Sequence, residues 1–131
     1  MASRRKSREQ ALQILFQLDA SPQPVDDAIA VYYASLSDAA PDPFTEELVR
    51  GVTVNRDALD ALIRKHSKHW RLERMPVVDR NLLRLALYEL TVLKGAPAVV
   101  IDEALELARR FSGDDSVPFI NGVLDAARKE L

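Results

Sequence analysis

The segment from 77 to 94 constrains the fold most strongly, because it is the most apolar stretch of the chain. Placed at ~100° per residue, its apolar side chains cover most of a helical circumference: Leu82, Leu83, Leu85, Ala86, Leu87, Leu90 and Leu93. The polar positions form only a narrow strip: Arg80, Asn81, Arg84 and Thr91. A helix that is apolar on nearly all sides is packed on nearly all sides. We therefore expect this segment to be the central, buried helix of the fold.

The remaining periodic segments also predict helices, separated by proline and glycine. We expect them near residues 7–19, 25–36, 43–54, 55–70, 100–111 and 116–129. Between 43 and 70 the pattern does not separate one kinked helix from two short ones, although Asn55 could cap a second helix. No segment alternates with the two-residue period of a strand. The sequence predicts an all-α fold of six to seven helices in one domain, 1–131.

Composition excludes several classes of protein. The chain has 131 residues, of which 47% are apolar and 29% charged, as in an ordinary globular domain. It has no cysteine, which excludes disulfide and thiol chemistry and fits a reducing cytoplasm. No apolar run is long enough for a membrane span or a signal peptide.

Few residues suggest catalysis or metal binding. The only histidines, His66 and His69, are three residues apart, but no cysteine or suitably spaced carboxylate completes a metal site. Glu103 and Glu106 lack the Glu-x-x-His repeat of di-metal bundles and are better explained as a solvated helix face. There is no Gly-rich phosphate loop or nucleophile elbow. We expect no metal, no cofactor and no enzymatic activity.

The N-terminus is locally basic although the net charge of the chain is −2. Four cations precede the first acid, Glu9: they are Arg4, Arg5, Lys6 and Arg8. Cations at a helix N-terminus oppose the helix dipole, and bound phosphate would compensate. The alternative, a frayed and solvated terminus, is slightly favoured by composition alone.

The stretch FSGDDSVPFINGVLDAA has the parts of a small base-reading site. Phe111 and Phe119 flank an acidic loop that contains Asp115, and RNA bases stack on aromatic rings and donate to carboxylates. The alternative, core phenylalanines with acids that favour the next helix dipole, is favoured by these residues alone. The Asn-Gly pair at 121–122 keeps helical register, and we hypothesise that Gly122 lets a neighbouring helix pack closely.

Four ordered blocks of the chain resemble one known family. RRKSREQALQILFQ, DRNLLRLALYEL, IDEALELARRF and FINGVLD are similar to the corresponding blocks of the NusB family of bacterial transcription antitermination proteins. The resemblance implies two small helical subdomains packed together, and binding rather than catalysis. It implies a partner, the small-ribosomal-subunit protein NusE, and single-stranded boxA RNA of nascent ribosomal transcripts. Together they promote an antitermination complex on RNA polymerase.

The resemblance also implies site residues. The expected RNA-binding residues are Arg4, Arg5, Lys6 and Arg8 for phosphates, Phe111, Asp115 and Phe119 for bases or sugars, and Phe16 nearby. The expected partner-binding residues are His66, Glu73, Asp79 and Arg80. We expect the cationic start and the two phenylalanines to converge on one patch.

Two other functions stay open at this point. One is an RNA-recognition module related to the N-terminal domain of an rRNA methyltransferase, although no Gly-rich cofactor domain follows Leu131. The other is a purely structural helical interaction domain. The resemblance also leaves open whether the chain forms a homodimer.

Overall fold

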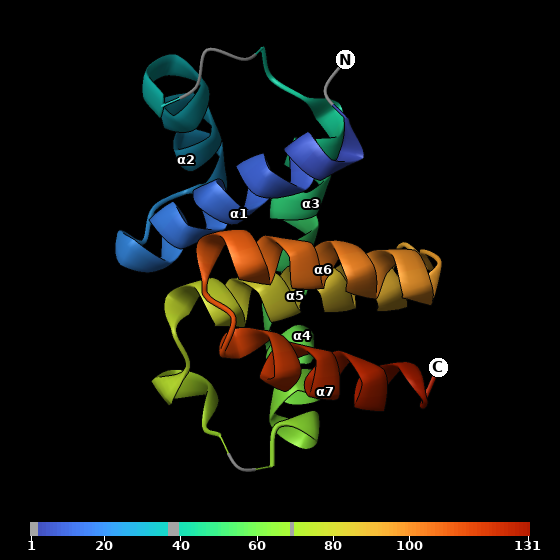
Figure 1. Cartoon of the computed structure of the whole chain (residues 1–131). Coiled ribbons are helices and arrows are strands. Elements are labelled where there is room, and N and C mark those ends of the chain that lie inside the picture. Colours follow the sequence, from blue (N-terminus) through green and yellow to red (C-terminus); the bar gives the residue numbers. More distant parts are fainter. Residues whose placement is uncertain (1–2, 37–39, 69) are drawn as a thin grey trace. The chain divides into compact units, whose positions relative to one another are not determined.

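The computed structural model describes residues 3–36, 40–68 and 70–131, and helices dominate that part of the chain (Figure 1). They are α1 (Arg4–Ala20), α2 (Val25–Val31), the π-helical turn η1 (Tyr32–Leu36), α3 (Pro43–Val54), α4 (Arg56–His66), the 3-10 turn η2 (Leu72–Arg74), α5 (Val77–Thr91), α6 (Pro97–Phe111) and α7 (Ser116–Arg128). The described residues contain no strand. The prediction of an all-α fold is therefore confirmed.

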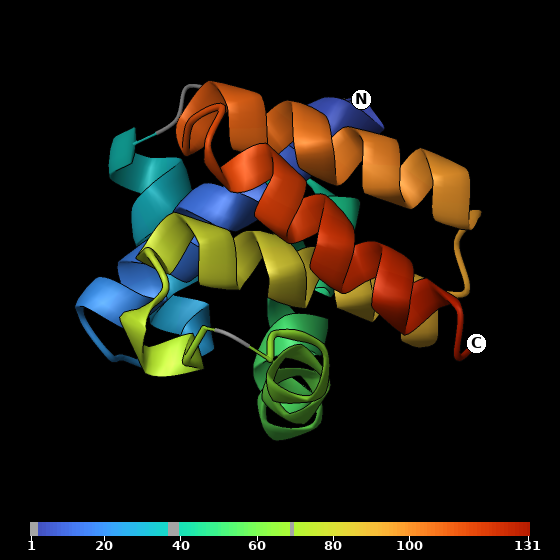
Figure 2. The same cartoon turned by 60° about the horizontal axis from the view of Figure 1, so that its bottom comes forward.

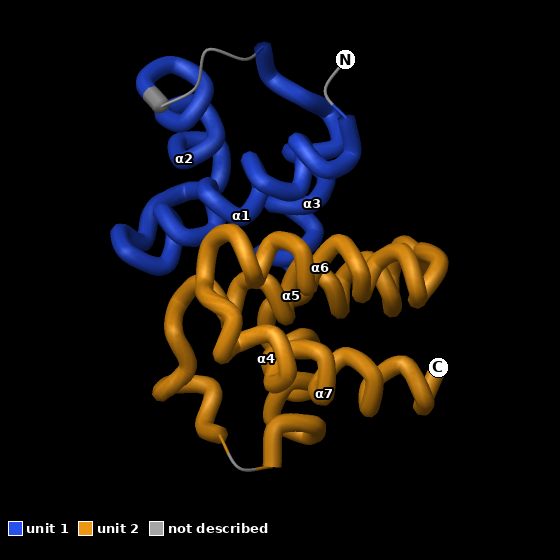
Figure 3. Tube along the Cα trace, in the orientation of Figure 1, with its two compact units in different colours: residues 1–54 blue, residues 55–131 orange. Residues whose placement is uncertain are grey.

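The chain divides into two compact helical units, Met1–Val54 and Asn55–Leu131 (Figure 3). The boundary falls between α3 and α4, so residues 43–66 form two separate helices rather than one kinked helix. Asn55 stands at the N-cap of α4, although its side chain makes no capping hydrogen bond. The predicted division into two helical subdomains is thus present.

In the first unit, α1 packs against α2 and α3. Its predicted apolar stripe is buried at Ala11, Ile14 and Leu15. The helix begins at Arg4, three residues before the predicted start at Ser7, because Ser3 caps it and accepts a hydrogen bond from the Lys6 amide at 3.1 Å. The cationic residues are therefore helical rather than frayed, although Arg4, Arg5 and Lys6 are solvent-exposed, as the alternative of a solvated terminus expected.

In the second unit, α5 is the central helix, and α4, α6 and α7 all contact it. In Figures 1 and 2, α6 and α7 run beside α5, and α4 meets it from a different direction. Every residue from 81 to 90 is buried, and for the apolar positions among them this confirms the prediction. None of the described helices is both long and apolar enough to cross a membrane.

Two residues of the polar strip, Asn81 and Arg84, are buried as well, which the pattern did not predict. Arg84 is 3% exposed, and its guanidinium donates to both carboxylate oxygens of Asp60 on α4, at 2.7 and 3.2 Å. It also donates to the Asn81 side chain at 3.1 Å. A buried charge needs such partners, so this cluster holds α4 against the polar side of α5.

The connection between α6 and α7 is short and tightly defined. Gly113 has φ +148°, a conformation that favours glycine. The Ser112 and Gly113 amides both donate to the Ala108 carbonyl at 2.9 Å, which closes the end of α6. Residues 112–115 therefore form a fixed loop that carries two adjacent acids.

Candidate RNA-binding surfaces in the two units

The cationic start of α1 is organised around an aromatic ring on α3. The Arg4 guanidinium carbon lies 3.9 Å from the centroid of the Phe44 ring, and that of Arg8 lies 5.9 Å from it. A cation–π contact restrains a guanidinium without neutralising its charge. Sequence reasoning missed Phe44, because nothing in the sequence shows that the first turn of α3 lies beside the first turns of α1.

The electrostatics of this helix start favour an anion. The first turn of α1 contains no acid, so the positive end of the helix dipole coincides with exposed Arg4, Arg5 and Lys6. Lys6, which is exposed, approaches the carboxylate of Glu9, which is buried, at 3.6 Å. Phe16, farther along α1, is 44% exposed, as expected for a residue off the buried stripe.

A polar network fixes the cationic helix start to α3. The Asp42 carboxylate accepts hydrogen bonds from the Ser7 hydroxyl and from the Thr45 amide and hydroxyl, the latter two at 3.1 and 2.9 Å. The Ser7 hydrogen bond, together with those from Thr45, lowers the pKa of Asp42 below its ordinary value of 3.8. One carboxylate therefore caps α3 and anchors the second turn of α1.

In the second unit, both predicted phenylalanines reach the surface. Phe111 is 36% exposed at the end of α6, and Phe119 is half-buried in the first turns of α7. Asp115 is exposed at the N-cap of α7, directly before the predicted helix start at residue 116, and its side chain makes no capping hydrogen bond. The interpretation of these rings as core residues is wrong, since neither is fully buried.

The structure brings two of these residues together with a third that sequence reasoning missed. Asp115 and Phe119 line a hollow of about 410 Å³ with Trp70 and Arg74. Phe111 is not among the residues that line it. The hollow combines two aromatic rings, one cation and two carboxylates, those of Asp115 and Asp79. Trp70 is the last residue of the predicted helix 55–70, and only its residue type was available as a signal.

Asp79, expected at the partner surface, is instead an internal anchor. It is 3% exposed, and its carboxylate accepts hydrogen bonds from the Ser112 hydroxyl and, at 2.9 Å, from the Ser116 hydroxyl. The two hydroxyls lie 2.9 Å apart. This network connects the first turn of α5 to both ends of the loop that carries Asp115.

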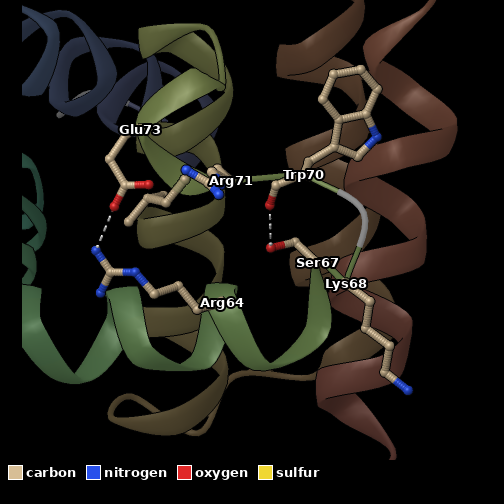
Figure 4. A pocket seen from close by; sticks show the side chains of 7 residues that line it. Arg64, Ser67, Lys68, Trp70, Arg71 and Glu73 are labelled. Atoms are coloured by element: carbon tan, nitrogen blue, oxygen red, sulfur yellow. Dashed lines mark hydrogen bonds and ion pairs between the residues drawn. The ribbon is translucent and has the colours of Figure 1, made fainter.

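The other expected partner-binding residues divide by accessibility. His66 is largely buried, with its Nε2 3.3 Å from the Glu130 carboxylate. Glu73 is exposed and pairs with Arg64 at 3.0 Å; its own backbone amide and that arginine lower its pKa (Figure 4). Arg80 is half-buried, and its Nε has no hydrogen-bond partner among the described residues. His69 lies outside the described residues.

The close-packing hypothesis for Gly122 is wrong. Asn121 and Gly122 do lie inside α7, as the helical register predicted. However, a Cβ atom at Gly122 would meet no atom of residues 3–36, 40–68 or 70–131 within 4 Å. This glycine faces open space and lines a second hollow, which also includes Trp70 and Phe119.

Comparison with known proteins adds evidence beyond geometry. The model of the NusB family matches residues 5–129. The chain is 59% identical to the transcription antitermination protein NusB of Solibacter usitatus over 100% of this chain and 92% of the relative. It is 44% identical to the protein of that name from Bacillus subtilis over 98% of this chain and 96% of the relative.

Solved structures give the same result. The fold is similar to NusB in the crystal structure of antitermination factors NusB and NusE in complex with dsRNA, with TM-score 0.87, 25% identity, and coverage of 98% of this chain and 97% of that one. It is also similar to T. maritima NusB, with TM-score 0.84, 35% identity, and coverage of 98% and 92%.

Proposed function

This chain belongs to the NusB family, and we propose on that basis that it acts with NusE on nascent ribosomal transcripts. It is a transcription antitermination factor, a binding protein rather than an enzyme. With NusE it binds the boxA element and promotes assembly of the antitermination complex on RNA polymerase. We place this activity in the cytoplasm, where bacterial transcripts are made.

One observation carries the RNA-binding proposal: a helix start with exposed cations and no acid in its first turn. Phosphate contacts dominate the affinity of proteins for nucleic acids. Arg4 keeps its charge while Phe44 restrains it, so it is a prearranged phosphate ligand. We assign exposed Arg4, Arg5 and Lys6 to phosphates, together with Arg8, of which only 9% is exposed beside the Phe44 ring. Exposed Phe16 lies on the same helix.

The second unit supplies base recognition in this proposal. Sequence-specific RNA binding uses unstacked bases, which stack on aromatic rings and bond through their edges. We assign stacking to Phe111 and Phe119, and acceptance from a base amino group to Asp115, whose exposed carboxylate caps no helix amide. The convergence of the two sets of residues on one RNA strand stays a prediction.

For the protein partner we propose direct contacts by Glu73 and Arg80, which are accessible at least in part. His66 and Asp79 act indirectly, because their polar atoms already face Glu130 and the two serine hydroxyls. In this proposal these two residues hold neighbouring surface residues in position and do not contact the partner themselves.

The test is a titration of fluorescently labelled boxA RNA with the chain, with and without purified NusE. We expect weak binding by the chain alone and tighter binding by the pair. If about four cations contact phosphate, log affinity falls with log salt with a slope of about −3 for a single strand. Equal affinity for boxA and a scrambled RNA in the presence of NusE would contradict the proposal.

A matched pair of variants sharpens this test. Arg4→Ala should weaken RNA binding and make the salt slope shallower by about 0.7. Lys129→Ala removes an exposed lysine that pairs with Asp125 at 3.2 Å at the end of α7, and it should change neither quantity. Similar losses from both variants would indicate nonspecific attraction.

A further inference from the structure

Trp70 is the only tryptophan of the chain, and it is 60% exposed. Its indole meets the Phe119 ring edge to face, with 6.2 Å between centroids and 69° between planes. Ser67 holds the backbone at this point: its hydroxyl donates to the Trp70 carbonyl at 3.2 Å, and its carbonyl accepts from the Trp70 amide at 3.1 Å. A large apolar ring is thus held at the surface of the unit.

Open space adjoins this ring. A hollow of about 350 Å³ is lined by Lys68, Trp70, Phe119 and Gly122, among others. Glycine inside a helix costs about 1 kcal/mol relative to alanine, yet no atom of the described residues lies within 4 Å of the place where a Cβ would be at position 122. Packing within the protein therefore does not account for this glycine, whereas a ligand in the hollow would.

The charges around Trp70 favour an anionic ligand. Lys68 lines the hollow at Gly122, and Arg74 lines the neighbouring hollow with Asp115 and with Asp79, whose carboxylate accepts from Ser112 and Ser116. A third hollow, of about 550 Å³, adds Arg64 and Arg71. Its one acid, Glu73, is paired with Arg64, and the indole points away from that pair (Figure 4). Proteins that bind single-stranded nucleic acid commonly combine cations with exposed aromatic rings on which the bases stack.

We propose that Trp70 and Phe119 form a two-ring stacking platform for an unpaired RNA base, with Gly122 as the floor of the hollow and Lys68 facing the phosphate. This inference rests on the proposed RNA-binding function and adds a site that the family resemblance did not supply. It extends base recognition from the loop before α7 to the segment after α4.

Because the chain has a single tryptophan, its intrinsic fluorescence reports directly on this platform. The first experiment titrates the full chain with single-stranded boxA RNA, with and without NusE. We expect quenching of Trp70 that saturates along the same curve as the anisotropy of labelled RNA. Inorganic polyphosphate, which has charge but no bases, should leave the fluorescence nearly unchanged.

Variants give a second readout. Trp70→Ala should weaken RNA binding about tenfold, whereas Trp70→Phe, which keeps a ring, should retain most of the affinity. Gly122→Ala should raise stability, since open space receives the methyl group and helix propensity improves, but it should weaken RNA binding severalfold. Circular dichroism and urea unfolding of each variant separate a folding defect from a binding defect.

The outcomes distinguish this inference from the function on which it rests. RNA binding with unchanged Trp70 fluorescence and unchanged affinity of Trp70→Ala overturns the platform and leaves the function intact. A fluorescence change caused by NusE alone, with Trp70→Ala weakening only the protein complex, assigns this surface to the protein partner and also overturns it. No RNA binding by any readout overturns both.

Discussion

Replacing Asp79 by alanine tests how the loop before α7 is held in place. The buried carboxylate accepts from Ser112 and Ser116, and a hydrogen bond to a charged group contributes about 1.5–3 kcal/mol. Ser112 is exposed and Ser116 half-buried, so water recovers part of this loss. Because the variant has no carboxylate to bury, it avoids the desolvation cost of that group, and this also reduces the loss. The variant loses in addition the favourable interaction of the carboxylate with the dipole of α5, which contributes about 0.3–1 kcal/mol. We expect a net destabilisation of about 2 kcal/mol.

The assay is urea unfolding followed by Trp70 fluorescence, which reports on the second unit. With a slope of about 1–3 kcal/mol per molar urea, the midpoint should fall by about 1 M. RNA affinity should fall as well, because the loop with Asp115 loses its anchor. Ser112→Ala is the matched control: it removes one donor and should give a smaller change of the same sign.

A double-mutant cycle decides between an anchor and a partner contact. Asp79→Ala and Ser116→Ala should be strongly non-additive in stability, because the two residues form one interaction. Additive losses of stability, or a variant that loses NusE affinity while its stability and RNA affinity stay at wild-type values, would refute the anchoring role.

Three further predictions concern single contacts. Phe44→Leu, which removes the ring beneath Arg4, should weaken RNA binding severalfold with a stability loss below about 1.5 kcal/mol; unchanged RNA affinity in a labelled-RNA titration would exclude the restraining role. The pKa of Asp42 is lowered below 3.8, so its stabilising contribution is present above the unfolded-state pKa and is lost as pH falls through the folded-state pKa. Urea unfolding from pH 7 to pH 3 should therefore show Asp42→Asn less stable at neutral pH and the gap closing below about pH 4; a gap that widens in acid would contradict this. Asp60→Ala leaves the buried Arg84 charge without its carboxylate and should cost about 3–5 kcal/mol in urea unfolding, and a loss below about 1 kcal/mol would show that Arg84 is solvated.

Periodicity predicted those parts of the fold in which burial repeats along the chain. The burial of residues 81–90 follows from an apolar pattern that leaves no wide polar face. The pairing of Arg84 with Asp60 could not be predicted, because it depends on which side of α5 is covered by α4. α1 begins earlier than predicted because Ser3 caps it. The arginine-rich segment that follows Ser3 has no apolar periodicity that would mark the cap in the sequence.

The candidate site was predictable in residue type but not in accessibility. Phe111, Asp115 and Phe119 were identified as a group, and the structure adds that both rings reach the surface. Asp79 was misplaced because a polar residue in the first turn of a helix is usually exposed, whereas here two serines from a distant loop bury it. Trp70 has no local signal beyond its residue type, since its contact with Phe119 spans 49 positions of the printed sequence.

The central claim is that one RNA strand is bound by residues of both units. Photo-crosslinking of boxA RNA with a single photoreactive base, in the presence of NusE, followed by peptide mass spectrometry, tests it directly. We expect crosslinks from nearby RNA positions to reach peptides from the start of α1 and peptides from residues 111–119. Crosslinks confined to one unit, at every position of the photoreactive base, would contradict it.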